Sequence, residues 1–368
     1  MKNLPTRDRC SGCGACAHRC PTNCITMFED SEGFKQPAID ADACIACGIC
    51  ESTCPVINEP YKRDFKPVAY GGASRDKDVK AQSSSGGMFS LFAKRILDRG
   101  GVVYGASYTK GFRVAHEGVR DEEGMKRLRG SKYMESDLNT CFDEIDKLLK
   151  QGVPVLFCGV PCNVGGLIAA VGDDENLFTV DILCHGAPSP LVWDIFLKEH
   201  EEKHSSKAVS VTFRDKSVGW RKSGMKIEFE NGDIFEQDKL YGDWMRAFLH
   251  DLMLRPSCHN CAYKTEERPG DVTLGDFWGV ENFTSEKDDN LGMSLMRINS
   301  EKGMQALKEL SDKLDMFEVD WHKAAEYNFG IFNAAPPQPL REEFLNRVGR
   351  ESFRDIVYDM LGDKARRF

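Results

Sequence analysis

Two groups of cysteines near the start of the chain repeat one spacing. The first is Cys10-x2-Cys13-x2-Cys16-x3-Cys20-Pro21, and the second is Cys44-x2-Cys47-x2-Cys50-x3-Cys54-Pro55. The small residues between them, mainly glycine and alanine, allow backbone amides to approach whatever the sulfurs hold. Three thiolates on one tight loop, followed by a fourth cysteine and a proline, are the ligand pattern of paired [4Fe–4S] clusters. The predicted chemistry is therefore electron transfer.

The same spacing predicts which cluster each thiolate binds. In a two-cluster arrangement, the fourth cysteine of each run binds the cluster of the other run. We therefore assign one cluster to Cys10, Cys13, Cys16 and Cys54, and its partner to Cys44, Cys47, Cys50 and Cys20. Zinc and disulfides are the alternatives, but zinc sites use pairs of cysteines and disulfide frameworks belong to short secreted chains. The doubled run with both prolines favours iron–sulfur.

Seven further cysteines lie outside this repeat. Cys24 is expected to pack against a cluster without binding it, and Cys141 to be an ordinary helical residue. The others occupy glycine- and proline-rich turns at predicted strand ends: Cys158, Cys162, Cys184, Cys258 and Cys261. Such turns meet at the binding edge of an α/β sheet, so four of these cysteines could hold a third [4Fe–4S] cluster. Two alternatives stay open from spacing alone: buried cysteine as a small hydrophobe, and zinc bound by the Cys258–Cys261 pair with His185 or His259.

Composition narrows the class of protein. The chain has 368 residues and a formal net charge of -9, which allows two or three domains. It lacks a block of basic residues, which argues against binding of nucleic acid. The first residues contain no apolar signal segment, and no apolar run approaches the roughly 18 residues of a membrane helix. We expect a cytoplasmic protein without a membrane span.

Hydrophobic periodicity predicts the elements that position these cysteines. Residues 1–58 form the predicted ferredoxin domain, and a polar stretch over 58–67 forms a linker. An α/β body follows in two parts, 67–152 and 153–330, and the chain continues into a helical tail over 331–368. In the body, predicted strands at 68–71, 153–160 and 177–184 lead into helices beginning near residues 88, 161 and 190. Asn231-Gly232 predicts a type I′ hairpin turn. The tail is amphipathic, and we expect it to dock on a neighbouring subunit of a homo-oligomer.

No nucleotide fingerprint supplies an alternative function. The chain has no Walker loop, and its one G-x-G-x-x-A match starts at Gly12, among the cluster cysteines. A nicotinamide-dependent Rossmann enzyme is therefore disfavoured.

Short motifs after the linker resemble one known family, the beta subunits of coenzyme F420 hydrogenases and dehydrogenases, in its bacterial branch. The motifs are Ser85-Gly86-Gly87, Gly130-Ser131-Lys132-Tyr133, Gly159-Val160-Pro161-Cys162, Cys184-His185-Gly186, Pro188-Ser189-Pro190, Phe213-Arg214-Asp215-Lys216, Leu254-Arg255-Pro256-Ser257-Cys258 and Gly275-Asp276-Phe277-Trp278-Gly279. The resemblance implies an α/β flavin-binding domain behind the bacterial ferredoxin-like dicluster domain. It also implies a noncovalent FAD beside a [4Fe–4S] cluster held by Cys162, Cys184, Cys258 and Cys261. Cys158 falls where the family has a non-cysteine residue, and Asn163 replaces the family's usual glutamine.

Candidate flavin and catalytic residues come from the same motifs. Amides at the start of a helix can bind the FAD pyrophosphate, which suggests Ser84, Ser85, Gly86 and Gly87, together with Ser131, Lys132 and Tyr133. Serine N-capping is the structural alternative there. Lys132 is expected to stabilise negative charge on a phosphate or on the reduced flavin, unless it is a solvated surface residue. His185 is expected to protonate substrate, or to support the neighbouring cluster by a hydrogen bond.

The sequence thus predicts an iron–sulfur flavoprotein oxidoreductase that is linked to F420 or to ferredoxin. A partner redox protein would exchange electrons with the ferredoxin clusters, and a small-molecule or coenzyme substrate would react at the flavin. A basic group around Trp220, comprising Arg214, Lys216, Arg221 and Lys222, could grip an acidic substrate or partner. The alternative is a relay subunit that performs no catalysis and only connects a partner enzyme.

Overall fold

The computed structural model describes residues 4–59, 61, 63–138, 140–238, 242–284 and 289–362. Residues 1–3 of the predicted ferredoxin domain, Pro60 and Lys62 of the predicted linker, and residues 363–368 of the predicted tail lie outside this part. In the described part, no helix combines the length and the apolar character needed to span a bilayer.

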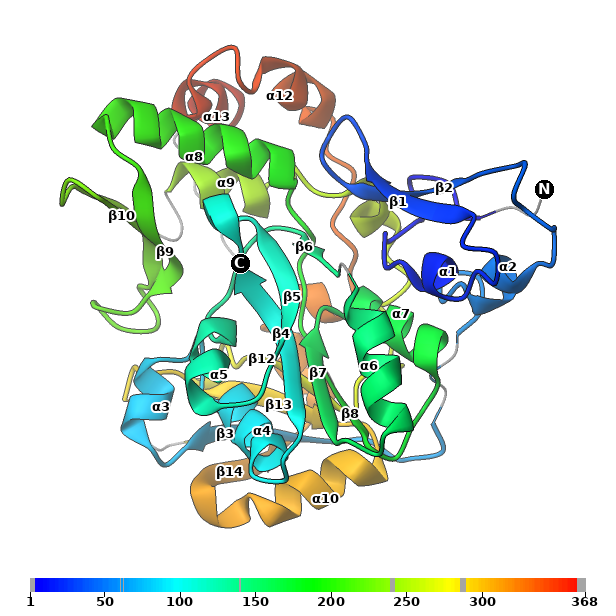
Figure 1. Cartoon of the computed structure of the whole chain (residues 1–368). Helices are drawn as coiled ribbons and strands as arrows, with labels where there is room; N and C mark the ends of the chain where they lie inside the picture. The colour runs from blue at the N-terminus through cyan, green and yellow to red at the C-terminus, as the bar shows by residue number, and fades with distance from the viewer. Residues whose placement is uncertain are drawn as a thin grey trace.

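The N-terminal module keeps the twofold repeat of its sequence in its backbone (Figure 1). An antiparallel hairpin, β1 (Ile25–Glu29) and β2 (Lys35–Ile39), lies beside two short helices, α1 (Ala15–His18) and α2 (Ile49–Thr53). Each helix begins after a glycine in the left-handed region, with φ of 79° at Gly14 and 77° at Gly48. Glycine adopts this conformation without steric cost, so both cysteine loops turn in the same way.

A nine-stranded mixed sheet forms the body. Its order is β14-β3-β13-β12-β8-β7-β4-β5-β6, with parallel pairing from β12 through β8 and β7 to β4 and antiparallel pairing from β12 to β14. The strands are β3 (Val68–Ser74), β4 (Val102–Tyr108), β5 (Val114–Val119), β6 (Ser136–Asp137), β7 (Val155–Gly159), β8 (Leu177–Ile182), β12 (Val272–Asp276), β13 (Ser294–Ile298) and β14 (Leu314–Val319). Because β4 and β7 are neighbours, residues before and after 152 build one continuous sheet. The predicted α/β class is confirmed.

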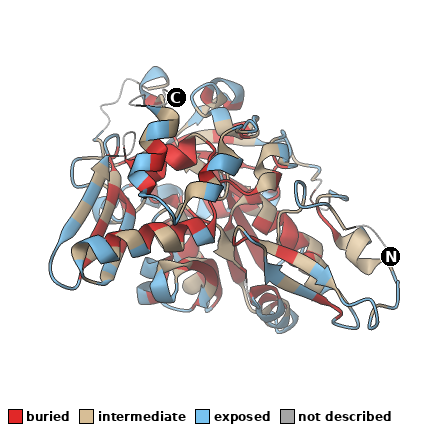
Figure 2. Ribbon diagram, turned by 90° about the horizontal axis from the view of Figure 1, so that it is seen from above, coloured by how far each residue is buried: buried red, intermediate tan, exposed pale blue. Residues whose placement is uncertain are grey.

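Helices cover both faces of this sheet, because successive apolar side chains of the strands point to opposite faces. On β7, Val155 and Phe157 pack toward α6 and α7, whereas Leu156 packs toward α4 and α10. Buried residues accordingly gather on the strands and the inner helix faces (Figure 2). The helices of the body are α3 (Lys77–Ala81), α4 (Met88–Leu97), α5 (Glu122–Leu128), α6 (Cys141–Lys150), α7 (Pro161–Val171), α10 (Glu301–Glu309) and α11 (Trp321–Ala325), with 3-10 turns at Lys110–Phe112, Pro256–Asn260, Val280–Asn282, Ser311–Lys313 and Phe329–Ile331.

A separate core joins a small sheet to the C-terminal helices. The sheet contains β9 (Ala208–Asp215), β10 (Gly224–Phe229) and β11 (Ile234–Asp238), and the helices are α8 (Pro190–His204), α9 (Asp243–Leu249), α12 (Arg341–Arg347) and α13 (Phe353–Leu361). Phe344, Phe353 and Ile356 are buried against Trp193 and Trp244 in this core. The amphipathic tail therefore packs its buried face on its own chain, and docking on a neighbouring subunit stays a prediction.

The β10–β11 hairpin has a different turn from the predicted type I′. Gly232 N donates to Phe229 O at 2.9 Å, and Phe229 N donates to Asp233 O at 3.0 Å. Only Gly232 of the loop has a positive φ, at 89°. This is a three-residue loop with a type I turn and a glycine bulge. The amide of Asn231 donates to Ser206 Oγ at 3.1 Å, which ties the turn to the end of α8.

Candidate functional site

The cysteines of the first predicted cluster lie together on the side of the module that faces the body. Burial, together with the smaller effect of the nearby thiolates of Cys10 and Cys54, raises the pKa of the Cys13 thiol to about 11. The pKa of Cys16 is also raised by burial and by the same neighbours. Gly12 N donates to Cys10 Sγ at 3.4 Å, as expected for a loop whose amides face its sulfurs. Buried thiols that repel each other as thiolates suit iron, because a bound metal stabilises the deprotonated form.

The second predicted set lies at the outer end of the module. Cys20, Cys44, Cys47 and Cys50 line one small pocket, and Cys47 is exposed. Cys24 lines the same pocket, with its Sγ 3.4 Å from Cys20 Sγ. The crosswise grouping predicted from the spacing is thus the grouping found in space, and Cys24 contacts a proposed ligand as expected.

Arg255 fastens the inner cysteine loop to the body. Its guanidinium donates to Cys10 O at 2.9 Å and to Lys35 O at 2.6 Å, both in the N-terminal module. Its Nη1 also donates to both carboxylate oxygens of Glu135, at 2.7 and 2.9 Å. A fork of five N–H donors can serve all three groups at once. A side chain of Gly12 would meet this guanidinium at 2.8 Å, so the module lies directly on it.

Three loops of the body bring four more cysteines together. Cys162 lies in the first turn of α7, Cys184 follows β8, Cys258 lies in the 3-10 turn Pro256–Asn260, and Cys261 directly follows that turn. Burial raises the pKa of Cys162 well above its ordinary value, and the thiolates of the other three raise it further. Ala187 N donates to Cys258 Sγ at 3.3 Å. Lys264 and Arg268 partly oppose the rise for Cys184 because their charges favour its thiolate. The donor set fits a cluster.

Cys158 belongs to a different environment. It packs with the α4 side of the sheet, whereas Cys162 and Cys261 pack on the side of α6 and α7. Its carbonyl oxygen lies 3.0 Å from His116 Nε2. The structure therefore gives no reason to include Cys158 in the third ligand set.

The zinc alternative needs a histidine beside Cys258 and Cys261. His185 Nε2 instead lies 2.7 Å from Asp251 Oδ1, and His259 Nδ1 lies 3.1 Å from Ala335 O. Across the residues that the structure describes, no three cysteine, histidine or acidic side chains converge closely enough for one ion. Both predicted histidine ligands have other partners.

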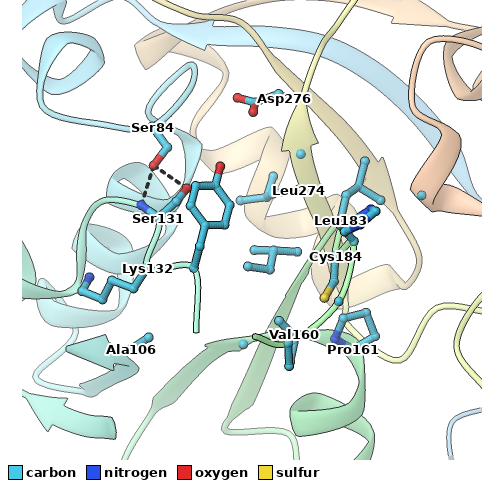
Figure 3. A pocket seen from close by; sticks show the side chains of 18 of the residues that line it. Ser84, Ala106, Ser131, Lys132, Val160, Pro161, Leu183, Cys184, Leu274 and Asp276 are labelled. Atoms are coloured by element: carbon cyan, nitrogen blue, oxygen red, sulfur yellow. Dashed lines mark hydrogen bonds between the residues drawn. The ribbon is translucent and has the colours of Figure 1, made fainter. Parts of the chain in front are cut away.

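A large cavity adjoins the third cysteine set. Its volume is about 1600 Å³, which exceeds the roughly 300–1,000 Å³ of an ordinary small-molecule site. All four loop cysteines line it, as do Ser84, Ser131 and Tyr133 on another wall. Figure 3 shows Cys184 on one side of the space and the Ser84–Ser131 pair on the other. A dinucleotide and a substrate therefore have room beside the cysteines.

The predicted Ser84–Gly87 segment only partly faces this cavity. Ser84 Oγ accepts from Ser131 N at 2.8 Å and from the Ser131 hydroxyl at 2.9 Å, which joins the two predicted flavin loops. Ser85 Oγ donates to Met293 O at 2.6 Å. The N-cap of α4 is Gly87, without a side-chain cap, so serine capping is not what these serines do. Gly86 differs from the prediction, because its amide donates to Ser294 Oγ and a side chain would meet Gly72 O at 2.6 Å.

Lys132 and Tyr133 have distinct surroundings. The Lys132 ammonium donates to Arg129 O at 2.9 Å and to Gly130 O at 3.2 Å, at the C-terminal end of α5. Burial lowers its pKa to about 8. Its ammonium therefore satisfies backbone carbonyls after a helix end, and Figure 3 shows the side chain turned away from Cys184. Tyr133 lines the cavity and packs its ring on Phe213 and Phe248.

His185 lies in the cavity wall directly after Cys184. Its bond to the buried Asp251 and its edge-on contact with Phe248, at 5.1 Å between ring centroids, hold the imidazole in place. This arrangement resembles a histidine oriented by a carboxylate beside a metal centre. A role as proton donor remains a prediction.

The basic group around Trp220 is mostly engaged within the chain. Arg214 pairs with Asp276 at 2.7 Å, Arg221 pairs with Glu281 at 3.0 Å, and Lys216 donates to Leu291 O at 2.6 Å. Trp220 is buried and stacks on Trp278, with centroids 4.6 Å apart. Three of the four cations are therefore engaged in contacts within the chain, which argues against the predicted binding of an acidic partner here.

Arg129 is a cavity residue that the sequence motifs did not indicate. Its guanidinium donates to Ser90 Oγ at 2.9 Å and to Gln82 Oε1 at 2.7 Å, both neutral groups. Burial lowers its pKa, and Glu122 and Asp76 oppose this only through longer-range attraction. The only sequence signal was its position directly before Gly130-Ser131-Lys132-Tyr133.

Comparisons with known proteins agree with the two halves of this arrangement. Residues 9–58 match the family model of the 4Fe-4S dicluster domain. Residues 153–320 match the family model for the C terminus of the coenzyme F420 hydrogenase/dehydrogenase beta subunit. The resemblance expected from the motifs is confirmed over these residues. The search of curated proteins found no match.

One similar solved structure comes from a xenon derivatization of the F420-reducing [NiFe] hydrogenase complex of Methanosarcina barkeri. A chain of that complex is 14% identical, with a TM-score of 0.50, over 80% of this chain and 94% of its own length. At this identity the likeness supports the fold.

Proposed function

We propose that this chain, which joins a 4Fe–4S dicluster domain to a C-terminal domain of the coenzyme F420 hydrogenase/dehydrogenase beta family, is an iron–sulfur flavoprotein oxidoreductase. The observation that carries the proposal is the single cavity lined both by the four loop cysteines and by the Ser84–Ser131 wall. Cys162, Cys184, Cys258 and Cys261 would hold a third [4Fe–4S] cluster, and the opposite wall would hold FAD. FAD supplies the exchange between one-electron iron–sulfur chemistry and two-electron substrate chemistry.

Residues of this chain are arranged along the proposed electron path from the surface of the ferredoxin module to the cavity. Cys47 is exposed at the outer end of the module, whereas Cys13 contacts the body at α7, so the module extends from the surface to the interior. Buried thiols become stable thiolates when they bind iron. His185, oriented by Asp251, stands where it could hold a proton beside the substrate space. A partner redox subunit would exchange electrons at the exposed end, and F420 or another small molecule would react at the cavity.

Arg129 is the residue we assign to the FAD pyrophosphate. It is a half-buried cation whose two hydrogen bonds go to neutral side chains, so an anion would relieve the cost of its burial. Lys132, in contrast, already serves three backbone carbonyls at the end of α5. Arginine also matches phosphate oxygens with a two-point fork.

The test is flavin retention in matched variants. Arg129→Gln should lower the FAD retained after anaerobic purification by about tenfold or more, because a charge-assisted bond contributes about 1.5–3 kcal/mol. Arg127→Gln is the control, since that side chain is exposed and pairs with Glu117 at 3.1 Å. Equal flavin in both variants would refute the assignment of Arg129. Wild-type protein without flavin would refute the flavoenzyme and favour the alternative of a relay subunit.

A further inference from the structure

A buried tyrosine lies between the inner ferredoxin cysteines and the loop cysteines of the body. Tyr263 is 2% exposed, and Cys13, Cys162 and Cys261 belong to the cluster of residues packed around it. Its ring stacks on Tyr61, with centroids 5.8 Å apart and an interplanar angle of 24°. The phenol therefore has a fixed position at the junction of two proposed ligand sets.

One face of α7 determines where the tyrosine hydroxyl lies. Cys162, Gly165 and Gly166 share this face, because residues three and four apart on a helix are neighbours. A side chain at Gly165 would meet Tyr263 Oη at 2.5 Å. One at Gly166 would meet Cys13 Cβ at 2.5 Å and Cys13 Sγ at 3.0 Å. The hydroxyl and the Cys13 sulfur thus rest on adjacent glycines of one helix.

The Tyr263 hydroxyl is buried, and in the described part of the chain it has no hydrogen-bond partner. Leaving such a group unsatisfied costs about 1–3 kcal/mol, so its position needs an explanation. Cys13 Sγ lies against Gly166, the residue next to Gly165 on the same helix, and an iron-bound thiolate or a cluster sulfide can accept a hydrogen bond. The residues present therefore fit a cluster that completes the bonding of this hydroxyl.

We propose that Tyr263 is a positioning residue of the inner ferredoxin cluster, to which its hydroxyl donates a hydrogen bond at or beside Cys13 Sγ. Reduction adds negative charge to the cluster, so a donor stabilises the reduced form and raises the reduction potential. A raised potential at the inner cluster favours movement of an electron from the outer cluster toward the body. The proposal rests on the ferredoxin clusters of the proposed function and is independent of the flavin.

The experiment is a redox titration of the anaerobically purified full chain, followed by electron paramagnetic resonance. Tyr263→Phe removes the hydroxyl and keeps the ring. Tyr61→Phe is the matched control, since it is the buried tyrosine stacked on the same ring. The inner-cluster signal is identified by its loss in Cys16→Ser. We expect Tyr263→Phe to shift that signal alone to a lower potential and to remove one exchangeable-proton coupling, while Tyr61→Phe leaves both unchanged.

A second variant keeps the test decisive if Tyr263→Phe fails to fold. Gly165→Ala would place a methyl against Tyr263 Oη and should shift the same signal in the same direction. Wild-type potentials and couplings in both Tyr263→Phe and Gly165→Ala would overturn the role of Tyr263 while leaving the clusters in place. A wild-type chain without an inner-cluster signal would overturn the proposed function as well.

Discussion

Gly166→Ala tests whether the ferredoxin module is seated on α7 as closely as the structure indicates. A methyl group at this position would lie 2.5 Å from Cys13 Cβ and 3.6 Å from Phe142 Cζ. Ordinary carbon contacts are about 3.5–4.0 Å, so the Cys13 loop would have to retreat by at least about 1 Å. The helix can yield little here because α7 packs both on the sheet and against the neighbouring α6.

Two opposing effects set the size of the change. Overpacking a filled contact typically costs about 1–3 kcal/mol. Alanine in place of glycine inside a helix returns about 1 kcal/mol. We therefore expect a net loss of about 0–2 kcal/mol, which corresponds to a fall of a few degrees in Tm for a protein of this size.

Hydrogen exchange measured by mass spectrometry locates the effect. Gly166→Ala should increase exchange in the peptide that contains residues 10–16, because the displaced loop loses its support. Ala169→Gly, on the same helix, is the control: it changes helix propensity by a similar amount in the opposite direction and should leave that peptide unchanged. A Gly166→Ala protein with a higher Tm and unaltered exchange over residues 10–16 would refute the close seating of the module.

Two further predictions follow from the contacts of buried cations. A lysine at position 255 cannot bind Glu135, Cys10 O and Lys35 O together, so Arg255→Lys should raise hydrogen exchange throughout the N-terminal module. Arg127→Lys is the control and should have no effect. Equal exchange in the two variants would contradict the role of Arg255. Lys132 has a folded pKa of about 8, lowered by burial from 10.5, so the unfolded chain binds more protons between these values and the free energy of unfolding should rise with pH there. Urea unfolding of wild type and Lys132→Met at both ends of that window checks this, and a difference between them that is independent of pH would contradict it.

The local parts of the structure were predictable from the sequence because they depend on near neighbours. Cysteine spacing predicts the two ferredoxin ligand sets, since each loop must wrap its own cluster. The turns after β7 and β8 brought Cys162 and Cys184 to one sheet edge, as expected for parallel strands. Residues 153–320 also carry enough of the family pattern to be matched.

The remaining features depend on contacts between distant residues, which spacing does not encode. Gly166 looks like any helical glycine until Cys13, some 150 residues earlier, is placed against it. Gly86 resembles a phosphate-binding glycine, yet its backbone is closed against Gly72 and Ser294. The predicted type I′ turn at Asn231-Gly232 was wrong. The backbone amide of Asn231 donates to Ser206 Oγ just after α8, and this tertiary contact outweighs the local preference of Asn-Gly.

The iron and flavin content of the anaerobically purified chain tests the central claim most directly. Three [4Fe–4S] clusters and one flavin predict about twelve irons and one FAD per chain. In Cys162→Ser, we expect about four irons fewer while both ferredoxin-type signals persist. About eight irons and no FAD in the wild type, or iron content in Cys162→Ser equal to that of the wild type, would contradict a third cluster beside a flavin cavity.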